Sequence, residues 1–489
     1  MTSMSVHQDR FDFTAPVVPI SELGSVHVTN VGGAGMSAVA RVLLGRDVPV
    51  SGSDPKDLPV LDALRQAGAD VHVGARPESV DQVDTVVVSS ATRETDPELA
   101  RARGLGKRVL HRSQALASAA DARRVVAVAG ANGKTTTTSM LTALLIDAGA
   151  DPSFAIGGEL AGLGTNAHAG GGEAFVIEAD ESDGSFLVYH PEVAIVTNVQ
   201  PDHLDHYGTF EAVQDAYLDF ARSIRPGGLL VACADDAGSA ALARRASDSG
   251  VRVLTYGTDV SADVRVLGHE VDGFRTVARV LDGDEEVRLA IAIPGAHNVL
   301  NATAAYAAAH HGLGVGADRA ATGLGAYTGT RRRFELKGEI GGVTVVDDYA
   351  HNPGKVAAVV GTAAGLVQRP ARLVVVFQPH LYSRTQDFAV ELAAGLRPAD
   401  VVVVMDVYAA REDPVDGVSG ALVADAVRDL AARDGGPSCE VHYVAGWPEA
   451  APLAAGLARA GDLVLTVGAG DVTQLGPQIL AAVEEGVRR

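Results

Sequence analysis

Short apolar runs rich in β-branched residues recur along the chain, and each is followed by a glycine-rich or polar turn and then a stretch with helical spacing. The clearest are residues 26–31, 125–129 and 373–377. Runs of this kind predict buried strands of parallel sheets, because a strand covered on both faces needs no alternation of polar and apolar side chains. The other strands expected on this pattern are residues 85–88, 175–177, 194–196, 229–232, 344–346, 401–405 and 463–467.

The order of these elements predicts the fold class. Strands alternate with helix-length segments, which is typical of doubly wound α/β sheets. Between residues 257 and 293 the pattern changes, since valines such as Val264, Val266, Val277 and Val280 are separated by polar residues. We therefore expect a short antiparallel excursion inside an otherwise parallel α/β architecture.

The chain is long enough for several domains. At about 150 residues per domain, 489 residues predict two to four. Polar or alanine-rich stretches at 118–124 and 326–333 separate helical patterns from a following strand and mark boundaries. We expect a flexible arm at 1–19 and three domains at 20–118, 119–328 and 329–489.

Composition and charge narrow the function classes. The 40 Lys and Arg residues against 61 Asp and Glu give a net charge of −21, which repels nucleic acid and anionic lipid. Cys233 and Cys439 have no metal-type spacing, and no 18 apolar residues occur together. These features predict a cytoplasmic protein without stable membrane insertion, in which any anionic substrate is held by local amides, metal ions and a few cations.

One segment carries a clear phosphate-binding pattern. Residues 130–135 read Gly-Ala-Asn-Gly-Lys-Thr, between an expected strand and a helical run at 136–148. Glycines let backbone N–H groups face phosphate oxygens, Lys134 can reach the terminal phosphates, and the Thr135 hydroxyl can bind magnesium. Val128 stands where the usual motif has its first glycine, so the loop is a shortened variant.

Two polar segments follow other expected strands. Residues 178–183 contain four acids, and residues 197–206 contain His203 among carboxylates. Beside a phosphate loop the acids favour a magnesium site, whereas alone they would suit a solvated acidic loop. A histidine in this position is either a metal ligand or proton carrier, or a structural side chain.

A glycine-rich turn follows the first strand. Residues 30–35 read Asn-Val-Gly-Gly-Ala-Gly, and Asp54 follows the next expected strand at a spacing found in NAD-binding folds. This fingerprint is weak on its own, since Asn30 stands in the position of the first glycine. A dinucleotide site therefore remains an alternative interpretation of this loop.

Taken together, the motifs resemble the ATP-dependent Mur ligases of peptidoglycan precursor synthesis, and within them the branch that adds L-alanine to UDP-N-acetylmuramate. The resemblance runs in order from about residue 26 onward. It implies a Rossmann-like N-terminal domain for the UDP sugar, a central P-loop ATPase domain with a parallel sheet, and a Rossmann-like C-terminal domain that binds the amino acid and closes on ATP. The matching segments are residues 32–37, 51–54, 89–91, 130–138, 178–183, 202–205, 294–298, 332–335, 347–351, 378–385, 406–412 and 468–471.

The resemblance also implies a role for individual residues. Positions that match magnesium ligands are Thr135, Glu178 and His203. Positions that match ATP-binding residues are Gly130, Asn132, Gly133, Lys134, Thr135, Thr136, Asn298 for adenine, Arg333 for the phosphates and Asp348 for ribose. Positions expected to contact the UDP sugar are Gly32, Gly33, Gly35, Met36, Ser37, Asp54, Ser89 and Ser90. Positions expected around the incoming alanine are Tyr349, His351, His380 and Arg384.

The implied reaction forms an amide in water. ATP phosphorylates the muramoyl carboxylate, the alanine amine attacks the acyl phosphate, and phosphate leaves. Lys134, His203 and Arg333 would assist at the phosphates, and His351 is a candidate by position for the proton of the amine. We expect that loss of Lys134 abolishes turnover with little change in the thermal melt.

Several positions depart from the usual alanine-ligase pattern. Asn30 replaces a glycine, Ala131 a threonine, Asn132 a histidine and Asn352 the second histidine after the tyrosine. Asn30 places a side chain where backbone is expected to approach phosphate, which bears on UDP affinity. The stretch 204–223 contains no lysine, so the carbamylated lysine of some sister ligases has no counterpart.

Other functions compete with this interpretation. Within the family, the nearest is the recycling ligase that adds a tripeptide to UDP-N-acetylmuramate, which has a different first glycine loop. Folylpolyglutamate-type ligases lack the first domain. Outside ligation, the alternatives are an NAD-dependent oxidoreductase and a catalytically inactive nucleotide-binding homologue.

Overall fold

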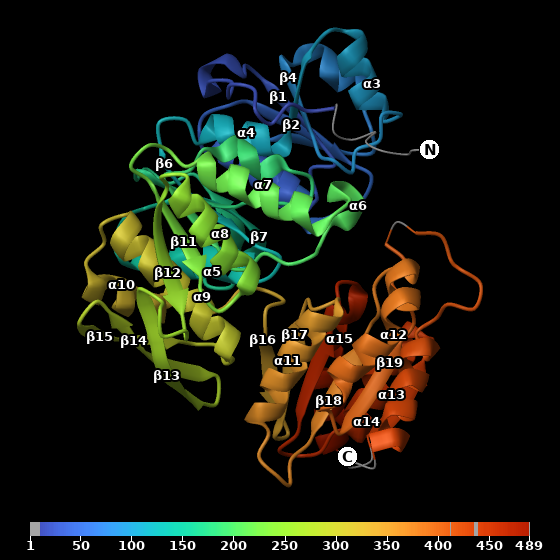
Figure 1. The fold of residues 1–489 in the computed structure, drawn as a ribbon. Helices are drawn as coiled ribbons and strands as arrows, with labels where there is room; N and C mark the ends of the chain where they lie inside the picture. The colour runs from blue at the N-terminus through green and yellow to red at the C-terminus, as the bar shows by residue number, and fades with distance from the viewer. Residues whose placement is uncertain (1–9, 411, 435–438, 489) are drawn as a thin grey trace. The chain divides into compact units, whose positions relative to one another are not determined.

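The computed structural model describes residues 10–410, 412–434 and 439–488, and the chain divides into two compact units, Met1–Thr328 and Gly329–Arg489 (Figure 1). Both units are α/β, as the strand and helix pattern predicted. The first unit contains two sheets and the second contains one.

The N-terminal sheet has five parallel strands in the order β3-β2-β1-β4-β5. The order reverses at β1 and β4, so the loops after these strands open a crevice at the carboxyl edge of the sheet. The strands are β1 (Val26–Thr29), β2 (Val50–Asp54), β3 (Asp70–Val73), β4 (Thr85–Val88) and β5 (Arg108–His111). The helices are α1 (Ala34–Leu44), α2 (Pro59–Gln66), α3 (Pro97–Gly104) and α4 (Arg112–Ala119).

The segment before β1 makes contacts with this domain. Arg10 donates to the carbonyl of Thr92 at 2.6 Å, and Gln114 donates to the carbonyl of Asp12 at 3.0 Å. The predicted flexible arm at 1–19 thus includes a packed part, because these polar bonds hold it on the domain surface. Residues 1–9 lie outside the described residues.

The central sheet has ten strands in the order β15-β14-β13-β12-β11-β10-β6-β9-β7-β8. Its middle is parallel and mostly apolar, while β13, β14 and β15 form the antiparallel excursion that the alternating valines predicted. The strands are β6 (Arg124–Ala129), β7 (Ser153–Leu160), β8 (Thr165–His168), β9 (Ala174–Glu178), β10 (Val193–Val196), β11 (Leu229–Cys233), β12 (Arg252–Gly257), β13 (Val264–Asp272), β14 (Arg275–Asp282) and β15 (Glu285–Ile291). The α-helices are α5 (Lys134–Asp147), α6 (Leu204–Tyr207), α7 (Phe210–Arg222), α8 (Ala237–Asp248), α9 (Ala296–Ala307) and α10 (Ala317–Gly323).

The two sheets of the first unit share one hydrophobic core. Buried side chains of α1 and α4, such as Val39 and Leu116, belong to the same cluster as Ala155 of β7 and Phe186 of the short 3-10 helix Ser185–Tyr189. Because apolar faces of both sheets are buried against each other's helices, their carboxyl edges are held in a fixed relation within this unit.

The second unit is built on a six-stranded sheet in the order β16-β17-β21-β18-β19-β20, in which β16 is antiparallel and the rest are parallel. The strands are β16 (Glu335–Ile340), β17 (Val343–Asp348), β18 (Leu373–Phe377), β19 (Val401–Met405), β20 (Glu440–Val444) and β21 (Leu463–Val467). The α-helices are α11 (Pro353–Leu366), α12 (Tyr382–Leu396), α13 (Ala421–Asp434), α14 (Trp447–Leu457) and α15 (Leu475–Arg488).

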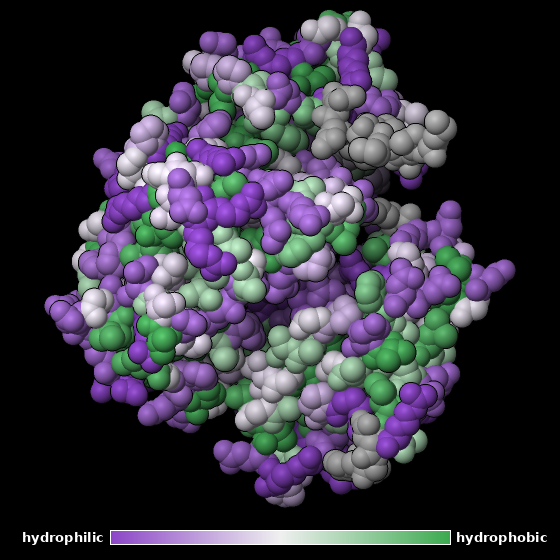
Figure 2. All heavy atoms as spheres, in the orientation of Figure 1, coloured by the Kyte–Doolittle hydropathy of each residue, from purple (hydrophilic) through white to green (hydrophobic). Residues whose placement is uncertain are grey.

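Every strand expected from an apolar run is present, with ends shifted by a few residues. The strand expected before Asp54 is β2, which ends at Asp54 itself and is mostly buried. Strands without a long apolar run, such as β5 with the sequence Arg-Val-Leu-His, were not predicted. The surface in Figure 2 is a mixture of hydrophilic and hydrophobic residues. Among the described residues, no helix combines the length and apolar content needed to cross a bilayer.

Candidate functional site

The phosphate loop lies between β6 and α5, where the sequence predicted it. Gly130 has φ +136° and Gly133 φ +86°, values that favour glycine. A Cβ at Gly130 would lie 2.0 Å from Thr197 Oγ1, so any side chain there would clash. The loop therefore needs glycine at these positions, and it leads into α5, whose first N–H groups have no partner inside the helix and can bind an anion.

Lys134 is the first residue of α5 and is held by a carboxylate. Its Nζ lies 2.8 Å from Glu181 Oε1 and 2.5 Å from the carbonyl oxygen of Gly130. Burial lowers the pKa of Lys134, but the charges of Glu181 and Asp180 outweigh burial and raise it. Lys134 is therefore a charged ammonium aimed at the phosphate loop, with Glu181 in the place where an anion would bind.

The acidic segment 178–183 is not a solvated loop, because its carboxylates have individual partners. Glu178 accepts from the Thr135 hydroxyl at 2.9 Å, and Asp180 accepts from Arg112 at 2.6 Å. Burial raises the pKa of Asp180, but the charges of Arg112 and Lys134 hold it well below its ordinary value. The segment thus connects the phosphate loop to the N-terminal domain.

Asp183 completes this connection. Its carboxylate accepts from the Ser90 hydroxyl, and its Oδ2 lies 3.5 Å from Nε2 of the fully buried His111. Ring centroids of Phe11 and Phe13 lie 5.3 and 5.2 Å from that of His111. Ser90, expected to contact the UDP sugar, is therefore tied to the acidic loop of the central domain.

The three positions that match magnesium ligands are only partly brought together. Thr135 contacts Glu178 directly, whereas His203 Nε2 lies 3.7 Å from Glu181 Oε1 and 3.9 Å from Asp202 Oδ2. Burial lowers the pKa of His203, but the nearby carboxylates of Glu181 and Asp202 raise it overall.

The donor set nevertheless suits magnesium and a nucleotide. Glu181 Oε2 is buried without a hydrogen-bond partner among the described residues, next to the Lys134 ammonium. A buried carboxylate oxygen of this kind calls for a further cation or a water. Hydroxyl and carboxylate oxygens are the ligands that magnesium prefers, so Thr135 and Glu178 fit the ion.

The position expected to read adenine is connected to the phosphate loop. Asn298, 4% exposed, lies in the first turn of α9, donates to the carbonyl of Pro294 and accepts from Asn301 at 3.2 Å. Asn301 in turn accepts from Thr137 of α5. Side-chain bonds therefore link the N-terminal turns of α9 and α5, which also contains the buried Thr136. Asn132 donates from its backbone N–H to Asn198 Oδ1 at 2.9 Å, which holds the loop shape.

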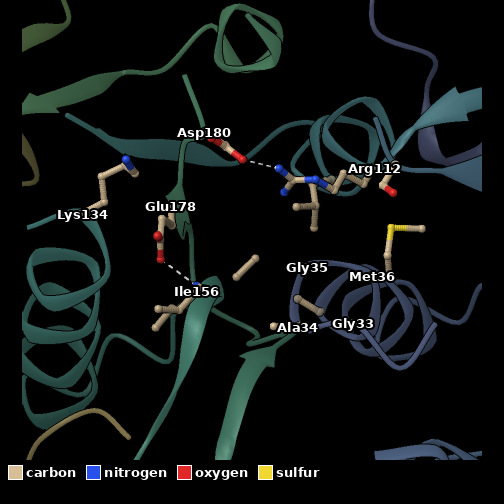
Figure 3. A pocket seen from close by; sticks show the side chains of 14 residues that line it. Gly33, Ala34, Gly35, Met36, Arg112, Lys134, Ile156, Glu178 and Asp180 are labelled. Carbon is tan, nitrogen blue, oxygen red and sulfur yellow. Dashed lines mark hydrogen bonds and ion pairs between the residues drawn. The ribbon is translucent and has the colours of Figure 1, made fainter. Parts of the chain in front are cut away.

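A cavity of about 370 Å³ joins the glycine loop to the phosphate loop (Figure 3). Arg112 and Lys134 are the positively charged side chains of its lining. Residues from the N-terminal domain include Gly33, Gly35, Met36, Ser89 and Arg112, and those from the central domain include Lys134, Ile156, Glu178 and Asp180. An anion bound in this cavity would therefore lie near residues of both loops.

The glycine loop is fixed by Asp54. One carboxylate oxygen of Asp54 accepts from the N–H of Gly32 at 2.9 Å and the other from that of Lys56. Asn30 has φ +50°, a conformation that asparagine tolerates better than most residues, which accounts for its replacement of glycine. Ser37 is buried in the first turn of α1 and donates to the carbonyl of Ala34, so it supports the loop.

Arg112 was missed from the sequence. It begins α4 directly after β5, at the same sheet edge as the glycine loop, and a Cβ on Gly35 would lie 3.3 Å from its Nη1. Its position one residue after a parallel strand could have marked it as a candidate binding residue. The strand β5 was not predicted, however, because its sequence Arg-Val-Leu-His is half polar.

In the second unit, the predicted residues gather where parallel strands end. Asp348 ends β17, and its two oxygens accept from the N–H groups of Phe334 and Ala350. Burial raises the pKa of Asp348 above its ordinary value, although the charge of Arg333 opposes this shift. Tyr349 has the guanidinium carbons of Arg332 and Arg333 at 4.8 and 5.2 Å from its ring centroid. Arg332, not predicted, donates to the carbonyls of Gly468 and Gly470 and is a structural anchor.

Three of the four residues expected around the amino acid form an aromatic row. The ring of His351 lies 5.0 Å from that of Tyr349 and 5.6 Å from that of His380, which stacks on Tyr408. His351 Nδ1 is 2.9 Å from the Tyr349 carbonyl, so Nδ1 carries the proton and Nε2 can accept one. The fourth, Arg384 in the first turn of α12, has a buried Nη1 without a hydrogen-bond partner among the described residues, a donor suited to a carboxylate.

The buried histidines predict a marked acid sensitivity. Burial lowers the pKa of His111 to about 4 and that of His351 to about 3. Between those values and the ordinary 6.5, the unfolded chain binds protons that the folded chain does not, so the free energy of unfolding falls as pH falls through this window. Thermal melts at pH 7.5, 6 and 5 should show this slope, with His111→Gln and His351→Gln each reducing it.

His168→Gln is the matched control for the acid-sensitivity prediction. His168 is 55% exposed and lies 3.8 Å from Asp151 in the same unit as His111. Its replacement should leave the slope unchanged. Equal slopes in all three variants and the unmodified chain would contradict the assignment of the sensitivity to His111 and His351.

Comparison with protein families matches each part of the chain. Residues 25–124 match the model described as "Mur ligase family, catalytic domain", residues 128–309 match "Mur ligase middle domain", and residues 332–470 match "Mur ligase, glutamate ligase domain".

Whole-length relatives agree. The UDP-N-acetylmuramate–L-alanine ligase of Kineococcus radiotolerans is 53% identical over 476 residues, covering 96% of this chain and 98% of the relative. That of Saccharopolyspora erythraea is 52% identical over 470 residues, with 94% coverage of both chains. Among solved structures, the UDP-N-acetylmuramate-alanine ligase MurC from Thermotoga maritima has a TM-score of 0.78 at 26% identity, covering 94% of this chain and 99% of that one.

Proposed function

This chain belongs to the Mur ligase family, and we propose that it joins L-alanine to the muramoyl carboxylate of UDP-N-acetylmuramate with conversion of ATP to ADP and phosphate. The resemblance recognised in the sequence is thereby confirmed at the level of the family. The relatives favour the alanine ligase over the tripeptide ligase and the oxidoreductase, since the curated relatives cited above carry the alanine-ligase name over nearly the full chain.

The observation that carries this proposal is the cavity that joins two anion-binding elements. The glycine loop with Arg112 lies at one side and Lys134 at the other. A UDP sugar bound with its diphosphate at the first loop would extend its carboxylate toward the second, where ATP phosphates would bind. The local cations explain how a chain with a net charge of −21 holds two anionic substrates.

The residues of the central domain would act on ATP in the following way. The N–H groups at the start of α5 and the Lys134 ammonium bind its phosphates, and Glu181 gives up its bond to Lys134 as the anion enters. Thr135 and Glu178, with His203, would hold magnesium, which offsets the charge on the transferred phosphoryl group. Asn298, in the first turn of α9, would hydrogen-bond the amino group and a ring nitrogen of adenine with its side-chain amide.

The second unit would supply the amino-acid site. The buried Nη1 of Arg384 pairs with the alanine carboxylate, and the aromatic row bounds the small side chain. The Nδ1 of His351 faces the Tyr349 carbonyl, which leaves Nε2 as an acceptor and makes it the candidate by position for the proton of the attacking amine. The chemistry then follows the family route of carboxylate phosphorylation and amine attack.

The proposal is tested by phosphate release from the purified chain. Release should require ATP, magnesium, UDP-N-acetylmuramate and L-alanine together, and omission of any one should reduce it to background. A panel of other amino acids and of L-Ala-γ-D-Glu tripeptides measures the choice of acceptor. Absence of alanine-dependent phosphate would reject the ligase function, and phosphate release with the tripeptide alone would assign the chain to the recycling branch.

Arg112 is expected to contribute to binding of the UDP sugar. Its side chain faces the glycine loop, and a charge-assisted hydrogen bond to an anion is worth about 1.5–3 kcal/mol. Arg112→Met should therefore raise the KM for UDP-N-acetylmuramate roughly 10- to 100-fold and leave the KM for ATP within about twofold. Arg112→Lys keeps the charge and serves as the control, with a smaller effect. An unchanged KM for the UDP sugar in Arg112→Met would contradict this role.

The same proposal places the reaction in the cytoplasm. ATP is available there, and both cysteines in the chain, Cys233 and Cys439, are free thiols, as suits a reducing compartment. Fractionation of cells that produce the chain, followed by assay of alanine-dependent phosphate release, measures this location.

A further inference from the structure

A second group of metal-binding side chains lies in the central domain, apart from the residues assigned to ATP. Asp282 is the last residue of β14, and His310 and His311 lie in the π-helical turn Ala308–Gly312 that follows α9. One ligand atom from each of these three side chains lies within 4.8 Å of the others. No step of the proposed ligation uses them.

The two histidines are consecutive residues of a π-helical turn. Successive side chains of an α-helix point about 100° apart, because a turn takes 3.6 residues. Here the ring centroids of His310 and His311 are 4.5 Å apart, with an angle of 61° between the rings. Wide turns of this kind are uncommon in helices and occur often at functional sites.

Both histidines are oriented for metal binding. His310 Nδ1 lies 2.7 Å from the carbonyl oxygen of Val315, which can only accept, so Nδ1 carries the hydrogen and Nε2 keeps its lone pair. His311 Nε2 lies 2.9 and 3.0 Å from the two oxygens of Asp282. A backbone carbonyl that fixes the ring opposite the ligand atom is the common outer partner of metal-binding histidines.

The carboxylate is fixed as well. Asp282 is 11% exposed in its side chain, and its Oδ2 accepts from the Tyr306 hydroxyl at 2.9 Å. The other contact of this carboxylate is His311, so both of its oxygens are held in place between two neighbouring side chains.

We propose that Asp282, His310 and His311 bind one divalent ion of the zinc class. Two imidazole nitrogens and one carboxylate oxygen suit zinc, cobalt or nickel, whereas magnesium and calcium prefer oxygen ligands alone. Binding replaces the proton that His311 Nε2 shares with Asp282. The ion joins the antiparallel excursion to the C-terminal end of α9, the helix whose first turn contains Asn298.

Zinc titration of the full-length, tag-free chain after removal of metal with EDTA tests the site. We expect one ion bound by calorimetry, visible absorption when cobalt is used in place of zinc, and a higher melting temperature with zinc than without. His310→Ala and His311→Ala should each weaken zinc binding at least 10-fold, because loss of even an outer hydrogen-bond partner of a metal ligand typically costs about 10- to 100-fold in affinity. Both substitutions should also remove the zinc-dependent rise in melting temperature.

Two controls separate this site from other sources of binding. His168→Ala removes an exposed histidine that lies 3.8 Å from an aspartate in the same unit, and it should leave zinc binding unchanged. His203→Ala removes the histidine near the phosphate loop and should also leave this site intact. Loss of the bound zinc in His203→Ala, or unchanged binding in both His310→Ala and His311→Ala, would overturn the proposal.

Folding is checked by melts in EDTA. His310→Ala loses the bond to the Val315 carbonyl but leaves the His311–Asp282 contact in place, so its melt without metal should fall only modestly. If His311→Ala does not fold, the result for His310→Ala decides.

Discussion

Lys134→Met is expected to lower the rate of ligation roughly 1,000-fold, the scale of effect seen when a fixed charge partner of a transition state is removed. The methionine keeps the length and packing of the side chain but cannot bind phosphate. Phosphate release under saturating substrates measures the change, and Lys134→Arg is the control that retains charge. Activity of Lys134→Met within about tenfold of the unmodified chain would contradict the assignment of the phosphate loop.

The structure changes what this substitution should do to stability. Sequence reasoning expected the melt to stay nearly the same. Lys134 and Glu181, however, are 16% and 3% exposed and pair at 2.8 Å, and removal of one partner of a buried pair costs about 3–5 kcal/mol. We now expect a clearly lower melting temperature for Lys134→Met.

A double variant separates the two effects. In Lys134→Met/Glu181→Gln no carboxylate is left without its cation, so the melting temperature should recover toward that of the unmodified chain while ligation stays near background. Recovery of activity along with stability would mean that Lys134 acts through the fold and not at ATP.

The sites at strand ends could be predicted because their signals are local. The phosphate loop, the acidic segment and Asp348 each follow an apolar strand directly, and the carboxyl ends of parallel strands meet at one edge. The chain's three-domain α/β class follows from the same periodicity and agrees with the three family matches.

The contacts between residues at different strand ends could not be predicted from the sequence. Arg112 with Asp180, and His111 with Asp183, are 68 and 72 positions apart, and nothing in either segment specifies its partner. The polar strand β2 depends on a pairing of the same kind, since the buried Ser53 donates its hydroxyl to Glu98 at 2.6 Å. Pairings of this kind depend on tertiary packing, which local periodicity does not encode.

Arg332 and Arg333 both lie over the ring of Tyr349, but we expect loss of Arg333 to lower the rate of ligation and loss of Arg332 to lower stability. The family resemblance gives Arg333 the role of a cation on the ATP phosphates, an interaction that in other phosphoryl-transfer enzymes is worth about 10³–10⁵ in kcat. Arg333→Met should therefore lower kcat roughly 1,000-fold. Its melting temperature should change little, because Asp348 keeps its bonds from the N–H groups of Phe334 and Ala350.

Arg332→Met should behave in the opposite way, which makes it the matched control. Its guanidinium donates to the carbonyls of Gly468 and Gly470 and lies 3.8 Å from the buried Asp347, so its loss should destabilise the unit by about 3 kcal/mol. Ligation below the lowered melting temperature should fall far less than in Arg333→Met. If both variants lose activity only in proportion to their loss of stability, Arg333 has a structural role like that of Arg332. If Arg333→Met alone has a lower kcat at an unchanged melting temperature, the charge of Arg333 acts in the reaction.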